Sequence, residues 1–255
     1  MAGSILTSPL AAGVSVWRVW QSQGGATPAM AAGHSLGEYS ALVAAGAIGF
    51  TDAIKLVAQR GRFMQEAVPE GIGAMAAILG LSDLDVATVC YDAAQGGVVE
   101  PVNYNSPGQV VIAGQAVAVQ RAVELAKEKG AKRALLLPVS VPSHCSLMEK
   151  AAQRLGDALQ ETTIVLPAFP VLHNVSVETA DSADDLRQVL TYQLHRPVRW
   201  VETVQKMAAD GVSLVIEAGP GKVLTGLNKR IEKSIKGMAV TDPAGLEAAL
   251  EAANA

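Results

Sequence analysis

The stretch "MAAGHSLGEYSALVAAG", residues 30–46, decides the fold class. A short apolar run leads into a segment with helical spacing, and Ser35 stands between Gly33 and Gly37 at the junction. A serine on such a turn can hold its hydroxyl clear of a sheet, where the helix N-terminus and the Leu36 N–H face an oxyanion. The pattern equally fits an ordinary serine N-cap with glycines for a tight turn. The motif is short, so both interpretations stay open.

Outward from this stretch, apolar runs alternate with helical patterns, which predicts an α/β protein with mostly parallel strands. Residues 71–140 have an order of their own. The predicted elements are a strand at 73–80, a helix at 84–94, strands at 97–105 and 108–114, a helix at 116–129 and a strand at 133–140. This is the βαββαβ order of ferredoxin-like units. We therefore expect one subdomain at 71–140, inserted into a larger α/β subdomain made of residues 1–70 and 141–255.

Composition narrows the class of protein. The chain has 255 residues, half of them hydrophobic, which is enough to bury a sizeable core. A net charge of −4 gives no basic face for nucleic acid. Two cysteines are too few for a disulfide framework, and residues 1–17 have neither a basic start nor an unbroken apolar core. We expect a cytoplasmic protein with no nucleic-acid or membrane partner.

Arg60 lies on the apolar stripe of the helix predicted for residues 51–67, three residues after Val57 and four before Met64. An arginine on an inner face cannot shed its charge and needs an anion. That anion is either an internal carboxylate or an acidic group of a substrate, held by a bidentate pair.

A general base for Ser35 would have to be one of four histidines: His34, His144, His173 and His195. His144 follows a predicted strand in a loop, where catalytic groups are well placed, but spacing ranks the four no further. The adjacent Cys145 also permits a Cys/His pair. "GPGKVL", residues 219–224, fails the phosphate-loop pattern, and no cysteine or histidine cluster has zinc spacing. We expect no metal and no cofactor.

Several segments together carry a recognisable pattern. They are "GHSLGEYSALVAAG", "QRGRFMQEAVPEG", "NYNSPGQVVIAG", "PVSVPSHCSLM" and "EAGPGKVLTGL", in this order. From about residue 16 to the C-terminus the chain resembles the bacterial malonyl-CoA:acyl carrier protein transacylases. The resemblance implies a hydrolase-like parallel-sheet subdomain with a ferredoxin-like insertion. It also implies an acyltransferase of fatty acid biosynthesis, which moves malonyl from malonyl-CoA to the phosphopantetheine thiol of acyl carrier protein through a malonyl-serine.

The resemblance assigns roles by position. Ser35 becomes the nucleophile, His144 its general base, and Arg60 the residue that binds the malonyl carboxylate, with Met64 beside it in the substrate site. The backbone carbonyl of Gln193 orients the histidine. The Leu36 N–H becomes one oxyanion donor.

An acidic carrier protein calls for a basic docking patch. The candidates crowd the helix expected after residue 224, and they are Lys222, Lys229, Arg230, Lys233 and Lys236. We take Lys229 and Arg230 as the docking pair. The alternative is a solvated, basic helix end.

The family begins with a strand and a Gly-Gln-Gly loop, whose glutamine N–H is the second oxyanion donor, and this sequence has no matching segment. Residues 1–13 carry no predicted element. We therefore expect weak transfer activity. Two alternatives stay open: a serine esterase or thioesterase of the α/β-hydrolase type, and a folded but inactive remnant. Arg60 distinguishes the transacylase from the esterase or thioesterase, because a hydrolase of neutral esters has no use for a buried arginine.

Overall fold

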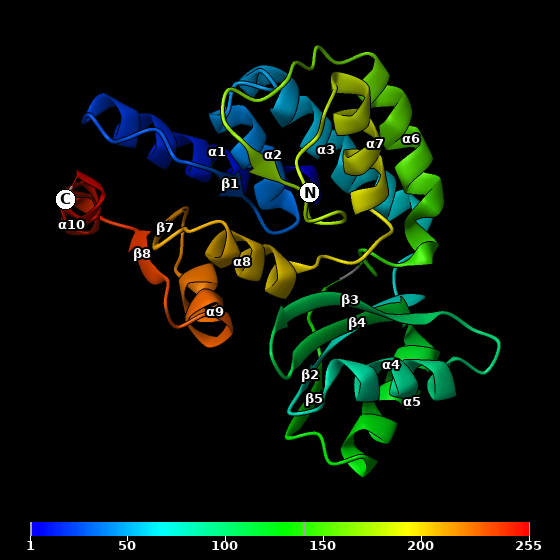
Figure 1. Cartoon of the computed structure of the whole chain (residues 1–255). Helices are drawn as coiled ribbons and strands as arrows, with labels where there is room; N and C mark the ends of the chain where they lie inside the picture. Colours follow the sequence, from blue (N-terminus) through cyan, green and yellow to red (C-terminus); the bar gives the residue numbers. More distant parts are fainter. Residues whose placement is uncertain (1, 140, 255) are drawn as a thin grey trace.

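The computed structural model describes residues 2–139 and 141–254, with side chains from residue 8 onward. Residue 140, where we expected the inserted subdomain to end, lies outside the described residues. Two lobes are visible in Figure 1: a small one built on an antiparallel sheet and a large one of helices around short parallel strands. The active-site candidates lie in the large lobe, close to where the small lobe joins it.

The small lobe has the predicted βαββαβ order. Its elements are β2 (Gly73–Leu79), α4 (Asp83–Ala94), β3 (Val99–Ser106), β4 (Gln109–Gln115), α5 (Ala116–Glu128) and β5 (Arg133–Leu136). The four strands form one antiparallel sheet in the order β3-β4-β2-β5. The last strand is shorter than predicted, since Pro138 has no N–H for a ladder.

The two faces of this sheet have different partners. Ile78 and Ile112 pack against α4 and α5, and Figure 1 shows both helices on that side. Met75 and Val111 point to the opposite face, where they meet Cys145 of the large lobe. The sheet is therefore buried on both faces, and one of its faces helps to join the lobes.

The large lobe contains two parallel strand pairs. The first pair is β1 (Ala31–Ala32) with β6 (Val171–Leu172), and the second is β7 (Leu214–Ala218) with β8 (Lys236–Val240). The predicted α/β class with parallel strands is confirmed. The sequence "FPVLHNV", residues 169–175, predicts a longer strand than β6. The prediction is wrong in length, because the chain turns directly after β6, where the Val177 N–H donates to the His173 carbonyl.

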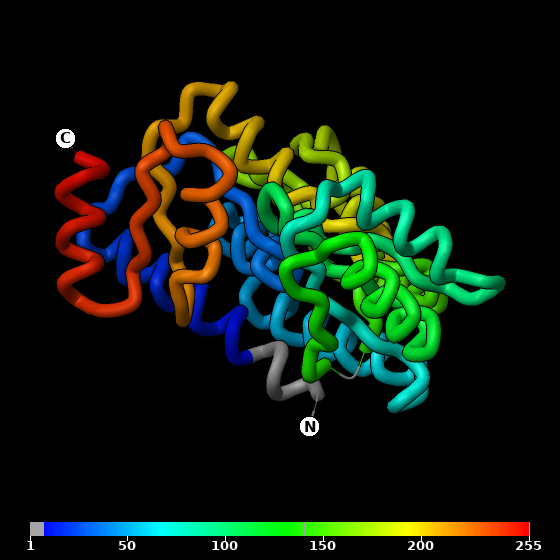
Figure 2. The backbone as a smooth tube through the Cα atoms, turned by 90° about the horizontal axis from the view of Figure 1, so that it is seen from below, coloured from blue at the N-terminus to red at the C-terminus, as the bar shows by residue number. Residues whose placement is uncertain are grey.

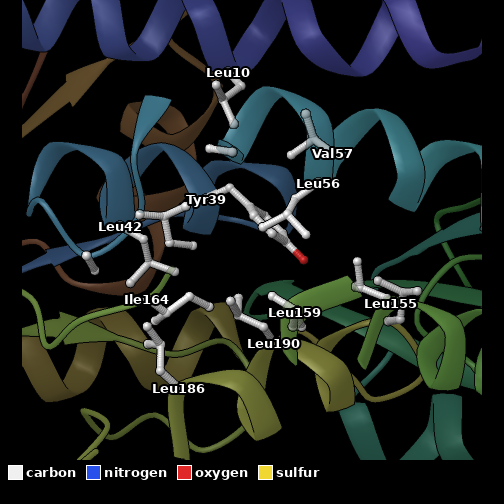
Figure 3. Packing of buried hydrophobic residues seen from close by; sticks show 14 of the residues in the cluster. Leu10, Tyr39, Leu42, Leu56, Val57, Leu155, Leu159, Ile164, Leu186 and Leu190 are labelled. Atoms are coloured by element: carbon white, nitrogen blue, oxygen red, sulfur yellow. The ribbon is translucent and has the colours of Figure 1, made fainter. Parts of the chain in front are cut away.

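Helices supply most of the large lobe. They are α1 (Ala2–Ser22), α2 (Leu36–Ala44), α3 (Phe50–Ala67), a 3-10 turn at Ser146–Met148, α6 (Glu149–Gln160), α7 (Ala183–Gln193), α8 (Trp200–Ala209), α9 (Val223–Ile231) and α10 (Pro243–Asn254). Figure 3 shows the main core, in which Tyr39, Leu56 and Leu159 meet between α2, α3 and α6. Figure 2 shows α10 beside β8 at the edge of the molecule.

Helix α1 was not predicted, and Pro9 lies inside it. Leu10 and Val14 of this helix are fully buried in the main core. Their burial, at about 1.5–3 kcal/mol for each large apolar side chain, offsets the loss of about 3 kcal/mol that a helix-interior proline brings. In the part of the chain that the structure describes, no helix is long and apolar enough to cross a membrane.

Candidate active site

Ser35 occupies the turn between β1 and α2 in a conformation that non-glycine residues rarely adopt. Its φ of 51° and ψ of −109° are not those of an ordinary N-cap, and its hydroxyl makes no capping hydrogen bond. Ser82 and Ser182, by contrast, have extended backbones and cap α4 and α7 by accepting from the N–H three residues on. The N-cap interpretation of Ser35 is therefore wrong. The turn leaves the Ser35 hydroxyl free of the helix N–H groups that an N-cap serine would bind.

Gly33 makes this turn possible. A Cβ at this position would lie 2.0 Å from the carbonyl carbon of Gly37, an impossible contact. The chain before Ser35 therefore passes against the first turn of α2 with no room for a side chain. Figure 1 shows α2 leaving directly from β1.

His144 reaches Ser35 from a loop that lies 109 residues further along the chain. Its Nε2 is 2.7 Å from Ser35 Oγ, and its Nδ1 is 2.6 Å from the carbonyl oxygen of Gln193. A carbonyl only accepts, so Nδ1 carries the proton and Nε2 accepts from the serine hydroxyl. Burial, together with the nearby Arg60 charge, lowers the pKa of His144 to about 3. The imidazole is thus neutral at neutral pH and can take a proton.

Arg60 of α3 lies on the other side of the Ser35 hydroxyl. Its side chain is 2% exposed, and Nη2 donates to Ser35 Oγ at 3.1 Å and to Gln193 Oε1 at 3.3 Å. Burial lowers the pKa of the guanidinium. Among the described residues no carboxylate forms an ion pair with it, and Nε has no hydrogen-bond partner. The buried Glu38 charge acts on Arg60 only from a distance. A buried guanidinium without a carboxylate in direct contact, beside the Ser35 hydroxyl, can bind an acidic substrate group.

A buried polar network supports the site from behind. The Glu38 carboxylate accepts from His173 Nδ1 at 2.7 Å, from the Asn174 N–H at 3.2 Å and from Gln193 Nε2 at 2.8 Å. Gln193 Nε2 also donates to the Ser35 carbonyl at 3.0 Å. Gln193 thus contacts Ser35 and Arg60 through its side chain and His144 through its backbone.

Sequence reasoning missed the roles of Glu38 and Asn174. A usable signal was present, because His173 and Asn174 directly follow an apolar run, and the carboxyl ends of adjacent parallel strands meet at one edge. Ser35 follows β1 and Asn174 follows the neighbouring β6. The polar residues after the carboxyl ends of β1 and β6 are therefore neighbours in space.

The Leu36 N–H begins α2 and has no hydrogen-bond acceptor in the described part of the chain. It is available to an oxyanion at Ser35. Met64, one turn after Arg60, is 5% exposed and packs in the main core. Helix spacing puts it on the same buried face of α3 as the arginine.

The other three histidines have different partners. His34 Nε2 lies 2.8 Å from Asn105 Oδ1, His173 binds Glu38, and His195 stacks edge-on against the Tyr192 ring. Cys145 is no alternative nucleophile, because it is buried, its Sγ donates to the Pro142 carbonyl, and burial raises its pKa to about 12.

The five basic candidates for docking are all exposed. Only Lys229 and Arg230 lie within α9, in its last turn. Lys222 precedes the helix, Lys233 follows it, and Lys236 begins β8, so of the five only the expected docking pair belongs to the helix itself. No group of three or more potential metal ligands occurs among the described residues.

Comparison with known proteins gives consistent matches. The acyl transferase domain family matches residues 9–248. The malonyl CoA-acyl carrier protein transacylase of Escherichia coli K12 is 57% identical over 242 residues, which cover 95% of this chain and 78% of that protein. A Vibrio cholerae acyl carrier protein S-malonyltransferase structure is 57% identical at a TM-score of 0.95, covering 97% of this chain and 81% of that one. A malonyl-transacylase solved in complex with a type II polyketide synthase acyl-carrier protein is 53% identical at a TM-score of 0.97, covering 98% and 81%.

Proposed function

The chain belongs to the bacterial malonyl-CoA:acyl carrier protein transacylases, and we propose that Ser35, His144 and Arg60 carry out the reaction of that family in it. The reaction transfers malonyl from malonyl-CoA to the phosphopantetheine thiol of acyl carrier protein, an acyltransferase step of fatty acid biosynthesis. An esterase or thioesterase for neutral substrates is not favoured, because it would leave the buried Arg60 charge without an anion.

In the first half-reaction Ser35 Oγ attacks the thioester carbonyl of malonyl-CoA while His144 Nε2 takes the hydroxyl proton. The Gln193 carbonyl holds the imidazolium that forms. The Leu36 N–H donates to the oxyanion of the tetrahedral intermediate. When the carbon–sulfur bond breaks, the CoA sulfur leaves with the proton from Nε2, and malonyl-Ser35 remains.

The second half-reaction reverses these roles. The phosphopantetheine thiol of the carrier gives its proton to Nε2, and its sulfur attacks the malonyl ester. The carbon–oxygen bond to Ser35 breaks and Oγ takes the proton back from Nε2. Chemistry of this kind gives ping-pong kinetics, since CoA leaves before the carrier reacts.

The observation that carries the proposal is the position of Ser35 Oγ between His144 Nε2 and Arg60 Nη2, at 2.7 Å and 3.1 Å. A guanidinium so close to the attacking oxygen selects acyl groups with a second, free carboxylate. Arg60 also holds the pKa of His144 down. A bound malonyl carboxylate offsets that charge and so makes the base stronger only when the correct substrate is present.

We extend the proposal to features with less direct support. Met64 lines the malonyl pocket one helical turn from Arg60, and Lys229 with Arg230 receives the acidic carrier. Residues 71–140 act as the ferredoxin-like subdomain, and residues 1–70 with 141–255 as the hydrolase-like subdomain that carries the nucleophile. The protein works in the cytoplasm, in keeping with Cys90 and Cys145, which are free and buried.

The test is covalent labelling with radiolabelled malonyl-CoA in the absence of carrier protein. We expect label on the wild type that survives performic acid, as an oxygen ester does and a thioester does not. Ser35→Ala should abolish the label. Ser182→Ala, which removes a serine that only caps a helix, should keep it. Label that persists on the Ser35→Ala variant would disprove the assignment.

A further inference from the structure

The side chain of Asn174 closes the turn that carries Ser35. Its Oδ1 accepts from the Ser35 N–H at 2.6 Å, and its Nδ2 donates to the Gly33 carbonyl at 2.7 Å. Asn174 is 1% exposed, so both bonds are made away from water. One amide therefore binds the backbone on both sides of His34, immediately before the nucleophile.

The turn needs such a clamp, because Ser35 is held in a left-handed conformation that costs about 1–3 kcal/mol for a residue other than glycine. Without a restraint, the serine would relax toward the extended conformation of a normal N-cap. Its hydroxyl would then turn from His144 to the free N–H groups of α2. Ser82 and Ser182 have this relaxed arrangement in the same protein.

Asn174 is itself held from two sides. Its backbone N–H donates to Glu38 Oε2, and its carbonyl accepts from the Arg199 N–H at 3.1 Å. It follows β6 by two residues, and β6 pairs with β1, which leads into the Ser35 turn. Asn174 thus follows β6, the strand that pairs with β1, and the turn that it closes follows β1.

We propose that Asn174 is a positioning residue for the acyl transfer reaction, which keeps Ser35 Oγ on His144 and leaves the Leu36 N–H as the oxyanion donor. The inference rests on the proposed role of Ser35 as nucleophile. Because Oδ1 occupies the Ser35 N–H, that donor cannot serve the oxyanion, whereas the next N–H along the chain is free. Both side-chain hydrogen bonds of Asn174 go to backbone atoms of the turn, so it acts on the serine hydroxyl through the backbone.

The experiment compares Asn174→Ala and Asn174→Ser with the wild type in rapid mixing with malonyl-CoA. The fraction of sites acylated and the rate constant of acylation are recorded separately. We expect both variants to acylate roughly 10–100-fold more slowly, because small misplacements of a reacting group cost that much. The malonyl-CoA concentration at half-maximal rate should stay unchanged, since the clamp does not contact substrate.

Asn228→Ala is the matched control, because Asn228 is also buried and accepts one hydrogen bond, from Trp200 Nε1 at 2.9 Å. It should lose stability but keep the acylation rate constant. A merely structural role for Asn174 would reduce the acylated fraction and leave the rate constant of the folded molecules at the wild-type value. That result would overturn the proposal.

A fluorophosphonate probe, which reacts with activated serines whatever their acyl specificity, separates this proposal from the proposed function. Wild type that reacts with the probe but not with malonyl-CoA would reject the malonyl assignment, and slower probe reaction of the two Asn174 variants would still support the clamp. Equal probe rates in wild type and variants, or no reaction of the wild type with either reagent, would reject the clamp.

Discussion

At the scale of the residue, the proposed chemistry depends on Arg60, a cation that is buried although proteins rarely bury one. Arg60 is buried beside a histidine and a serine, and both its burial and its effect on His144 cost free energy. The neutral Nε2 that results is free to accept the serine proton at any pH well above 3. In the mechanism that we propose, the carboxylate of an anionic substrate pairs with this cation.

We predict that Arg60→Ala shifts the enzyme from malonyl toward acetyl thioesters. A charge-assisted hydrogen bond contributes about 1.5–3 kcal/mol, so the preference for malonyl-CoA over acetyl-CoA should fall by roughly tenfold or more. Acylation by acetyl-CoA should not slow, because the loss of the cation makes His144 a stronger base. The measurement is kcat/KM for both donors.

Arg62→Ala is the control for this change, since Arg62 is exposed on the same helix. It should leave the preference as it is. An equal loss for malonyl and acetyl donors in Arg60→Ala would make Arg60 a structural residue instead.

Some of these residues could be predicted and others could not. Helical spacing is a local property, so it found Arg60 on the buried face of α3. Which of four histidines meets Ser35 depends on a contact across 109 residues, which spacing does not encode; only the family resemblance pointed to His144. Asn174 contacts Ser35 across 139 residues. Its place after an apolar run indicates the edge of the sheet at which it lies, but no local pattern indicates which residue it binds there.

At the scale of the element, β1, the turn and α2 form one unit with little freedom. Helix and strand positions were predicted well where the apolar pattern continues over many residues, as in α3 and the small-lobe sheet. The two-residue strands β1 and β6 lie within longer runs of strand-like sequence, whose length does not show where strand pairing stops. Helix α1 was missed because Pro9 signalled a break that burial of Leu10 and Val14 overrides.

Two glycines that flank Ser35 should respond differently to the same change. Gly33→Ala would press a methyl group against the backbone of Gly37 and Glu38, at 2.0–2.4 Å, and should lower the melting temperature sharply or prevent folding. Gly37→Ala adds a methyl group in open space within α2. It should stabilise the protein by up to about 1 kcal/mol, the helix propensity difference between the two residues. Thermal melts of both variants test this, and similar melting temperatures would contradict the close packing of the turn.

At the scale of the whole molecule, the two lobes meet beside Ser35. His34, next to Ser35, bonds to Asn105 of the small-lobe strand β3. The same strand exchanges backbone hydrogen bonds with Val198, through Val102 and Tyr104. Helix α9 packs against β3 as well as β8. One strand thus connects the Ser35 turn with the helix whose last turn carries Lys229 and Arg230.

Lys229 and Arg230 put exposed positive charge on α9, a helix that packs against the small lobe, on a protein whose net charge is −4. An acidic carrier approaching a negative protein needs such a local patch to be steered. We predict that Lys229→Glu with Arg230→Glu raises KM for the carrier by roughly threefold to tenfold at low salt, as expected for a few exposed charge pairs. The acylation of Ser35 by malonyl-CoA alone should stay unchanged.

The same charge reversal on Lys55 and Arg62 of α3 is the matched control, because both residues are exposed and belong to a different helix of the large lobe. It should leave KM for the carrier close to the wild-type value. Salt separates steering from contact: at about 1 M salt the Debye length falls to about 3 Å, and the difference between the α9 variant and the wild type should nearly vanish. A carrier KM that the α9 reversal does not move at low salt, or that both reversals raise equally, would place the docking surface elsewhere.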